Sequence, residues 1–274
     1  MSSHGLPSPR RFRIGTVNVH SFRSPFSRKS NAKVLATILA PYNLDVLAVE
    51  EMRHDDNWTI LHEQLSLNHT AVGLSGGVSF GNAIASRYPI AEEHNQITQQ
   101  QYTGGTRAML RCRFGGDHPF VQKRTFAVTH LDHFDEDDRL LQLKEFSMDK
   151  GDIDILVGDL NALAKDDYTD DYLNEVVGTK RELSGWEQPR FELIQSLVQT
   201  YGFQDTFRQI NPHFQNTKVV TCPYGTRIDY ILHRPLSNDL WKLTECFIVD
   251  TRRSTDHNAI VATFECTSSI DLSN

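Results

Sequence analysis

The sequence predicts an α/β protein with mixed sheets, on the basis of three observations. Short apolar runs that are typical of buried strands alternate with amphipathic segments that are typical of helices. Several consecutive strand segments have no helix between them, so the sheets should be mixed and not purely parallel. No linker or internal repeat divides the chain. We therefore expect one domain over residues 11–267, between a disordered lead at residues 1–10 and a polar tail at residues 268–274.

The first half of the chain contains four predicted strands and a helix. The run FRIGTVNVHSF predicts a strand that ends near Asn18, and residues 33–42 have the apolar spacing of a helix. The continuous apolar run LDVLAVEEM predicts a buried strand with carboxylates at its exit. GNAIASRYPI and GTRAMLRCRF predict two further strands, which we expect to be antiparallel neighbours. The Gly-rich run GLSGGVSFGN lacks the Gly-Lys-Ser/Thr ending of a phosphate-binding loop and predicts a flexible loop.

The second half contains five predicted strands and two helices. TFAVTHLD predicts an apolar strand followed by a helix over residues 136–149, and DIDILVGDLNAL predicts the clearest buried strand. Residues 190–201 predict an amphipathic helix that Gly202 closes. TRIDYILH, ECFIVD and HNAIVATFE predict the last three strands.

Composition is that of an ordinary soluble globular protein. The 274 residues are 39% hydrophobic and 23% charged, which is enough to bury a large core. A net charge of −7 argues against a broad basic surface for nucleic acid, although a short basic groove beside a metal site is compatible with it. The first residues have no apolar signal-peptide core and no stretch has the length of a membrane span. We expect a soluble intracellular monomer in the cytoplasm or the nucleus.

The four cysteines are scattered and lack the spacing of a zinc site. Three of them, Cys112, Cys246 and Cys266, lie in or beside apolar stretches, and the fourth is Cys222. This placement favours reduced structural thiols over a disulfide pair.

Polar residues recur at the ends of the predicted strands. They are Asn18, Glu51, His130, Asp159, Asn161 and Asp229 within or just after a strand, and Asp256 and His257 just before one. One such residue is usually a turn former or a helix cap, but eight along one chain are harder to explain in that way. Because strand ends meet at the edge of a sheet, we expect these side chains to share a cleft. Their carboxylate, amide and imidazole groups favour Mg²⁺, Mn²⁺ or Ca²⁺ over zinc or copper.

Six motifs in order resemble those of the endonuclease/exonuclease/phosphatase superfamily: TVNVH, VEEM, THLD, GDLNA, RIDYIL and STDHNAIV. The resemblance covers about residues 11–265, and GDxN with a terminal Asp-His is specific in combination. It implies a four-layer α/β sandwich in which two packed mixed β-sheets are flanked by helices. It also implies hydrolysis of phosphate esters with Mg²⁺ or Mn²⁺ as the cofactor.

The resemblance assigns residues to the metal and to the attacking water. Glu51 would be the main metal carboxylate, with Asn18 and Asp256 completing the metal environment. Asp159 would orient or deprotonate the water. Asn161 would hold that water together with a phosphoryl oxygen.

Three further residues are assigned to the phosphate by the same resemblance. His257 would bind the phosphate and stabilise charge on it. Asp229 would fix the tautomer of this imidazole and favour its charged form. His130 would donate a hydrogen bond to a phosphoryl oxygen.

Three positions depart from the family pattern. Glu50 replaces the usual Gln before the metal glutamate and would add a negative charge near the metal. His20 stands where the repair nucleases often carry Asp, which argues against a dedicated abasic endonuclease, and we assign it to substrate binding. Thr255 replaces Ser before Asp256, a minor change.

Three features have alternative interpretations. Arg107 follows a Gly turn and enters a predicted strand, and phosphate contact and a surface ion pair are equally open for it. Zinc binding by His130, Asp132 and His133 is disfavoured by the missing thiols. The acidic insertion at residues 165–189 is either a solvated lobe or a substrate-side flap, with Tyr168, Tyr172 and Trp186 available to stack on a base or ring.

The sequence as a whole predicts a metal-dependent hydrolase of phosphate esters, a phosphodiesterase or nuclease that acts on nucleic acid by in-line attack of an activated water. The alternative is a phosphodiesterase or phosphatase for a lipid or inositol phosphate, but no basic cluster that would grip several phosphates is evident. A binding protein that lost catalysis ranks last, because the residues assigned to catalysis are all present.

Overall fold

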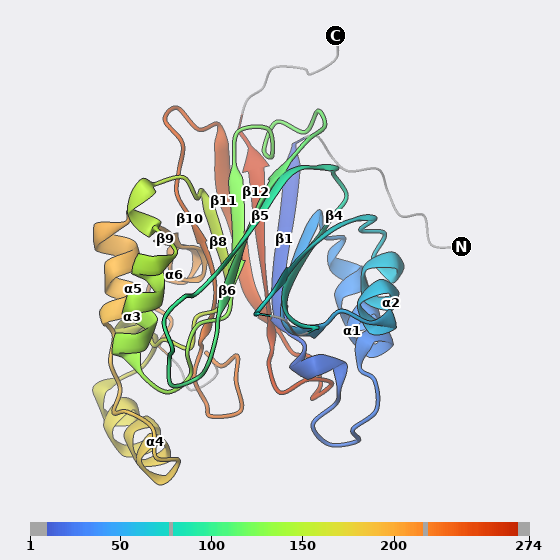
Figure 1. Cartoon of the computed structure of the whole chain (residues 1–274). Coiled ribbons are helices and arrows are strands. Elements are labelled where there is room, and N and C mark those ends of the chain that lie inside the picture. The colour runs from blue at the N-terminus through green and yellow to red at the C-terminus, as the bar shows by residue number, and fades with distance from the viewer. Residues whose placement is uncertain (1–9, 77–78, 216–218, 268–274) are drawn as a thin grey trace.

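The computed structural model describes residues 10–76, 79–215 and 219–267. The expected lead at residues 1–10, apart from Arg10, and the expected tail at residues 268–274 lie outside the described residues. Two six-stranded sheets pack face to face, with helices on both outer sides (Figure 1). This arrangement confirms the four-layer α/β sandwich.

The first sheet has the order β11-β12-β1-β2-β4-β3. Its strands are β1 (Arg11–Asn18), β2 (Val46–Arg53), β3 (His69–Leu74), β4 (Phe80–Ser86), β11 (Trp241–Val249) and β12 (Ala259–Cys266). Strands β1 and β2 are parallel, whereas the other pairs are antiparallel. The sheet is therefore mixed.

The second sheet has the order β5-β6-β7-β8-β10-β9. Its strands are β5 (Ile90–Ile97), β6 (Ala108–Phe114), β7 (Thr125–Thr129), β8 (Ile155–Asp159), β9 (Gln204–Asp205) and β10 (Asp229–His233). Only β7 and β8 are parallel among its described pairs, so this sheet is also mixed.

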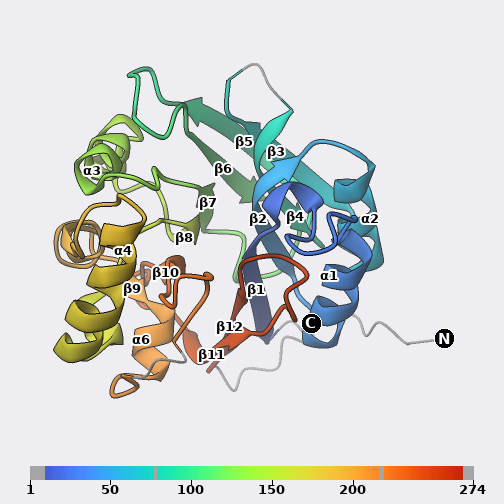
Figure 2. The ribbon, with the colours of Figure 1, turned by 90° about the horizontal axis from the view of Figure 1, so that it is seen from below.

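The helices cover the two outer faces (Figure 2). The first sheet is covered by α1 (Ala32–Leu39) and α2 (Asp56–Gln64), and the second by α3 (Glu136–Glu145) and α5 (Glu192–Gln195). The helix α6 (Thr206–Ile210) lies against β10 and β11 and contributes Phe207 to the core between the sheets. The helix α4 (Thr179–Leu183) lies beyond the sheet edge. Shorter 3-10 or π-helical segments are η1 (His20–Phe22), η2 (Ala40–Tyr42), η3 (Met148–Lys150), η4 (Lys165–Asp167), η5 (Tyr172–Gly178) and η6 (Ser196–Thr200). No described helix has both the length and the apolar character that a membrane crossing needs.

Three apolar cores follow from the alternation of side chains along the strands. In β2, Val46 and Ala48 face the core between the sheets, whereas Leu47 and Val49 face the core beneath α1 and α2. A third core lies between the second sheet and its helices, where Leu156 of β8 packs with the helix residues. The described residues form no disulfide, and Cys112, Cys222 and Cys246 are buried, as expected for structural thiols.

Two expectations about the strands are wrong. Strands β4 and β6 are not neighbours, because β4 pairs with β2 and β3 in one sheet while β6 pairs with β5 and β7 in the other. They face each other across the central core, through Ile84 and Leu110. The Gly-rich run at residues 73–82 is not simply a loop, because its two ends belong to β3 and β4.

Candidate active site

The direction of the strands explains why the polar strand ends meet. Strands β1, β2, β7 and β8 end at one edge of the two sheets. Strands β10 and β12 run antiparallel to β8 and β1, so they begin at this edge, and Asp229 lies opposite Asp159 in the register. Figure 1 shows α4 on one side of this edge and the segment after β1 on the other.

A cleft of about 340 Å³ opens at this edge. Of the residues assigned from the sequence, seven line it: Glu51, Arg107, His130, Asp159, Asn161, Asp256 and His257. The other three lie beside or behind these residues. Asn18 and Asp229 are buried, and His20 has its Nδ1 3.3 Å from Asp256 Oδ2.

A bulge in β2 separates the two adjacent glutamates. The register between β2 and β4 shifts between Val49 and Met52, and Glu51 has a φ of 52°. A non-glycine residue in this region costs about 1–3 kcal/mol and is characteristic of functional sites. As a result the Glu51 side chain reaches the cleft with 28% of its surface exposed, whereas Glu50 is fully buried.

Glu50, which we expected to add a negative charge near the metal, is buried and does not line the cleft. Its Oε1 accepts a hydrogen bond of 2.6 Å from Thr16 Oγ1 inside the protein. Burial, and then the neighbouring Asp229, raise the pKa of Glu50 well above its usual value. This shift favours the protonated side chain, which as a neutral group resembles the glutamine that usually stands here.

Asn18 connects the acids of the cleft. Its Nδ2 donates to Glu51 Oε1 and to Asp159 Oδ2, both at 3.1 Å. Its Oδ1 accepts the backbone N–H of His20 at 3.0 Å, and its carbonyl oxygen accepts from Thr255 Oγ1 at 2.8 Å. Thr255 thus supplies the hydroxyl that a serine would supply. The side chains from β1, β2 and β8 are fixed relative to one another by this one amide.

The residues suited to hold a divalent cation are Glu51 and Asp256, with Asn18 beside them. Both carboxylates are a little over a quarter exposed, and neither pairs with a Lys or Arg among the described residues. Asp159, Asp229 and His257 also place possible ligand atoms within 4.8 Å of one another. That group is less suited, because both ring nitrogens of His257 already face carboxylates. The oxygen-only set matches the preference of Mg²⁺ and Mn²⁺.

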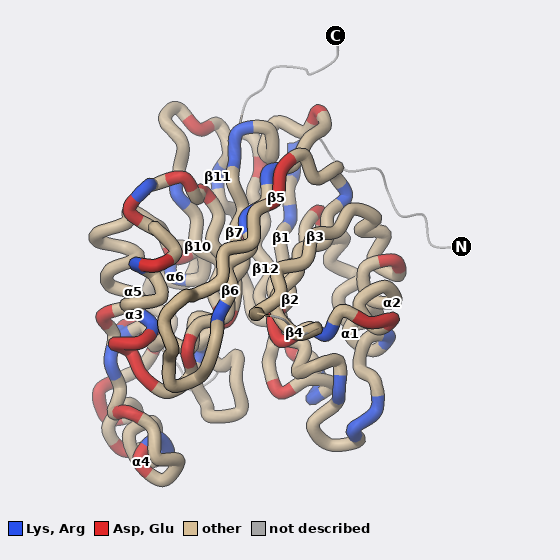
Figure 3. Tube along the Cα trace, in the orientation of Figure 1, with Lys and Arg blue, Asp and Glu red and all other residues tan. Residues whose placement is uncertain are grey.

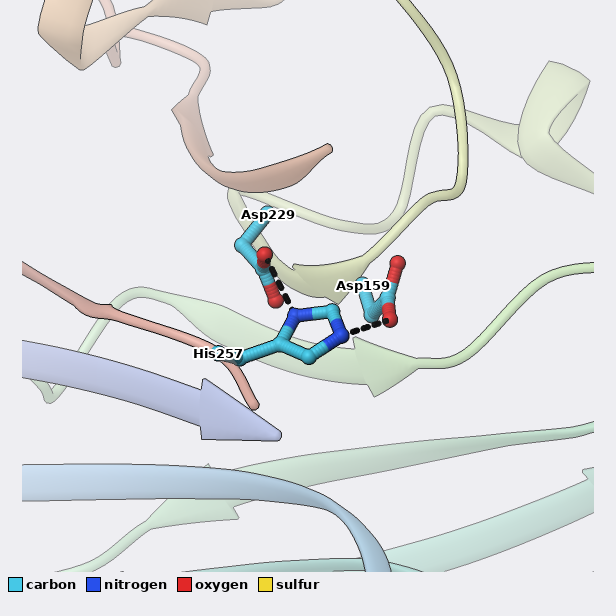
Figure 4. A group of neighbouring side chains, drawn as sticks. All are labelled: Asp159, Asp229 and His257. Atoms are coloured by element: carbon cyan, nitrogen blue, oxygen red, sulfur yellow. Dashed lines mark hydrogen bonds and ion pairs between the residues drawn. The ribbon is translucent and has the colours of Figure 1, made fainter. Parts of the chain in front are cut away.

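His257 lies between two aspartates, as Figure 4 shows. Its Nδ1 is 2.9 Å from Asp229 Oδ2, and its Nε2 is 3.7 Å from Asp159 Oδ2. Burial alone would lower the pKa of His257, but Asp229 and then Asp159 raise it well above the usual value. The two aspartates therefore favour the positively charged form of the imidazole.

Asp159 and Asn161 share a tight turn after β8. Asp159 Oδ1 accepts the backbone N–H of Asn161 at 3.0 Å, and Asn161 has a φ of 49°. The Nδ2 of Asn161 donates to Leu131 O at 3.1 Å. Burial, and then Asp229, raise the pKa of Asp159 above its usual value. A carboxylate with a raised pKa is a stronger base than an ordinary aspartate.

Arg107 is not in a surface ion pair. It is 7% exposed, and its guanidinium contacts His133 Nδ1 at 3.2 Å. Its Nε is buried without a hydrogen-bond partner among the described residues. Burial, and then the charge of Arg107, lower the pKa values of His130 and His133. The guanidinium of Arg107 therefore lies in the cleft beside two neutral imidazoles, and His133 is a lining residue for which no substrate role was predicted.

Residues of the insertion form one wall of the cleft, and most of them were not named from the sequence. Its lining residues include Val177, Lys180, Arg181 and Trp186, and Pro223 and Tyr224 join them from the segment before β10. Of the three aromatic residues expected to stack on substrate, only Trp186 lines the cleft. Tyr168 is buried, with its hydroxyl bonded to Val219 O. The Tyr172 hydroxyl is bonded to Gly225 O.

Solved structures share the fold over nearly the whole chain. An endonuclease/exonuclease/phosphatase from Beutenbergia cavernae is 20% identical with a TM-score of 0.67, over 95% of this chain and 72% of that one. A 3'-5' exonuclease (NExo) from Neisseria meningitidis is 22% identical with a TM-score of 0.64, over 93% and 100%. D. rerio TDP2 complexed with a single-strand DNA product is 19% identical with a TM-score of 0.63, over 93% and 99%.

The sequence comparisons point to the same group. No curated protein matches the chain significantly. The model of the endonuclease/exonuclease/phosphatase family matches residues 15–257, which include all the residues assigned above. The chain belongs to the endonuclease/exonuclease/phosphatase family.

Proposed function

We propose that this protein is a metal-dependent phosphodiesterase that cleaves nucleic acid by attack of an activated water. The observation that carries the proposal is one cleft with two kinds of charge. The carboxylates of Glu51, Asp159 and Asp256 line it together with His257, whose imidazole is held by Asp229. All of these groups come from one chain, so a monomer would suffice.

The residues divide the chemistry of hydrolysis between them. A divalent cation at Glu51 and Asp256, with Asn18 beside it, would stabilise negative charge on the phosphoryl group. Asp159 would orient the water and accept its proton, and Asn161 would hold the same water. Base assistance of this kind is typically worth about 10²–10⁴-fold in rate.

The phosphate would be held by the three groups that surround it. The charged His257 would stabilise charge that develops on the phosphoryl oxygens in the transition state. Neutral His130 would donate an N–H to one of these oxygens. The unpartnered Nε of Arg107 makes this guanidinium a further donor for the phosphate.

Two basic loops beside the cleft favour nucleic acid as the substrate. The basic loops carry five exposed cations: Arg23, Arg28, Lys29, Arg252 and Arg253. Asn31 holds the loops together, because its Nδ2 donates to Val19 O and to Ser254 O at 3.0 Å. None of the five forms an ion pair with a described residue, and Figure 3 shows blue segments gathered below α1. This cluster, which was not evident in the sequence, would bind neighbouring phosphates of a polymer.

The test is turnover of a substrate panel: single-stranded DNA, RNA, abasic duplex, sphingomyelin and an inositol phosphate. We expect cleavage of a nucleic acid with Mg²⁺ or Mn²⁺, and loss of activity in EDTA. Asp159→Asn and His257→Ala should each lower kcat by at least about 100-fold while circular dichroism shows a folded protein. Preferred turnover of sphingomyelin or the inositol phosphate would reject nucleic acid as the substrate, and normal turnover in either variant would reject the assigned roles.

A further inference from the structure

The wall of the cleft opposite the basic loops carries two aromatic rings that no catalytic step uses. Trp186 from the insertion and Tyr224 from the segment before β10 both line the cleft. Their ring centroids are 4.3 Å apart, with an interplanar angle of 66°. Tyr224 is 42% exposed, so its ring is open to a ligand.

We propose that Trp186 and Tyr224 form a subsite that binds the base of a nucleotide next to the phosphate being cleaved. The inference rests on the proposed function for its substrate class and names the part of the substrate that this wall recognises. Planar aromatic ligands bind to exposed aromatic side chains through stacked or edge-to-face contacts. The rings share one cleft with Arg107, His130 and His257, so one ligand can contact both groups.

Charge beside the rings suits a nucleotide. Lys180 is exposed, its Nζ donates to Tyr224 O at 3.2 Å, and it forms no ion pair with a described residue. The guanidinium of Arg181 lies 5.9 Å from the centroid of the Trp186 ring. A positive charge next to a pair of rings favours a ligand in which a planar group is joined to phosphate. The acyl chain of a lipid has no negative charge that could pair with Lys180.

Ion pairs and hydrogen bonds tie the wall to the body of the protein. Glu187 forms ion pairs with Arg139 of α3 and with Arg181, and its carbonyl oxygen accepts from Arg181 Nε at 2.7 Å. The Tyr172 hydroxyl donates to Gly225 O at 3.1 Å and ties the insertion to the segment that carries Tyr224. A surface that is already ordered loses little conformational entropy when a ligand binds.

The test compares two ligands that differ only in the base. Thymidine 5'-monophosphate and 2-deoxyribose 5-phosphate are titrated by calorimetry into the full-length protein with Ca²⁺ present. We expect the nucleotide to bind at least about 10-fold more tightly than the sugar phosphate, which is the contribution of one stacked base. Trp186→Ala and Tyr224→Ala should each reduce this ratio, whereas Trp186→Phe, which keeps a ring, should largely preserve it.

A matched control lies in the same insertion. Leu183 is 84% exposed and does not line the cleft, so Leu183→Ala should leave the ratio unchanged. Equal binding of the two ligands to the unmodified protein would overturn the inference, as would an undiminished ratio in both Ala variants. Octyl phosphate is titrated in the same way as a third ligand, and tighter binding of it than of the nucleotide would also overturn the inference. Because the readout is binding, it is independent of turnover of the substrate panel, which tests the proposed function separately.

Discussion

At the scale of single residues, the adjacent Glu50 and Glu51 show how the backbone decides the role of a side chain. Both are glutamates at the end of the same strand, but the bulge at Glu51 sends one into the cleft and the other into the core. Burial, and then Asp229, raise the pKa of Glu50, which favours its protonated form. Of the two glutamates, Glu51 is therefore the one placed to bind a cation.

Replacing each glutamate by glutamine separates the two roles. Glu51→Gln should weaken Mn²⁺ binding by on the order of 100-fold, because it removes a charged ligand. Glu50→Gln should leave Mn²⁺ affinity close to that of the unmodified protein, since glutamine can accept the same hydrogen bond from Thr16. Calorimetric titration with Mn²⁺ measures both. An equal loss in the two variants would show that Glu50 is charged in the folded protein.

The charge on His257 gives a prediction about pH. Asp229 and Asp159 raise the pKa of His257, so the imidazole stays charged to a higher pH than an ordinary histidine. In Asp229→Asn this pKa should fall, and the alkaline limb of the kcat/KM profile should move to lower pH by about one unit or more. The acidic limb should move in the same direction, because Asp229 also raises the pKa of Asp159. If the alkaline limb stayed at the same pH in Asp229→Asn, this limb would not reflect the ionisation of His257.

The residues that gather at the cleft were predictable because a motif is local in sequence, whereas the orientation of a side chain is not. Asp159 and Asn161 could be assigned from the short run that carries them. The inward direction of Glu50 depends on a bulge that no sequence pattern marks. The burial of Tyr168 likewise depends on a residue far away in the chain, because the Tyr168 hydroxyl donates a hydrogen bond to the carbonyl oxygen of Val219.

At the scale of elements, the basic loops provide a local positive charge that the negative net charge of the chain does not reveal. The chain has a net charge of −7, and yet two loops distant in sequence carry five exposed cations, in the segments that adjoin His20 and Asp256. Phe26 is 69% exposed, and the guanidinium of Arg253 lies 5.5 Å from its ring centroid. Such a mixture of cations and an exposed ring is typical of surfaces that bind single-stranded nucleic acid.

Neutralising two of these cations should weaken only the binding of polymers. The double variant Arg252→Gln/Arg253→Gln should raise KM for single-stranded DNA and reduce the slope of log(kcat/KM) against log[salt] by about 1.4, or about 0.7 for each lost phosphate contact. Turnover of bis-p-nitrophenyl phosphate should not change. Arg113→Gln is the control, because Arg113 is exposed on β6 and pairs with Glu92 away from the cleft. A salt slope equal to that of the unmodified protein would exclude these loops from the substrate path.

Elements with a buried apolar pattern were predicted, and exposed ones were not. Strands β1, β2, β8 and β12 carry continuous buried residues and were found from sequence. Strand β5 is exposed or half-buried along its whole length, so it has no apolar alternation to reveal it. Because β5 was missed, β4 and β6 were wrongly paired, although a connection through β5 places them in different sheets.

At the scale of the whole molecule, an aromatic cluster between the sheets lies at the opposite end of the strands from the cleft. The aromatic cluster between the sheets includes Phe12, Phe114, Phe120 and Phe126, with Phe12 and Phe120 stacked at 4.2 Å. Phe126 lies near the start of β7, whereas His130 follows the end of that strand. This separation allows a core change to affect stability without reaching the cleft.

Truncation of the aromatic cluster should therefore lower stability and spare catalysis. Phe126→Ala should cost about 3–5 kcal/mol in the free energy of unfolding, because the ring is fully buried and leaves a cavity. Guanidinium titration measures the loss. The variant should keep its kcat at 15 °C, well below its own unfolding transition. A large loss of kcat in the folded variant would show that the two ends are mechanically coupled.

The location of the metal tests the account most directly. Crystals grown or soaked with Mn²⁺ and measured for anomalous scattering would show where the cation binds. We predict a peak at about 2.0–2.3 Å from carboxylate oxygens of Glu51 and Asp256, with the ring of His257 not coordinated. A peak between Asp159, Asp229 and His257 with Glu51 uncoordinated, or no peak in the cleft at millimolar Mn²⁺, would contradict it.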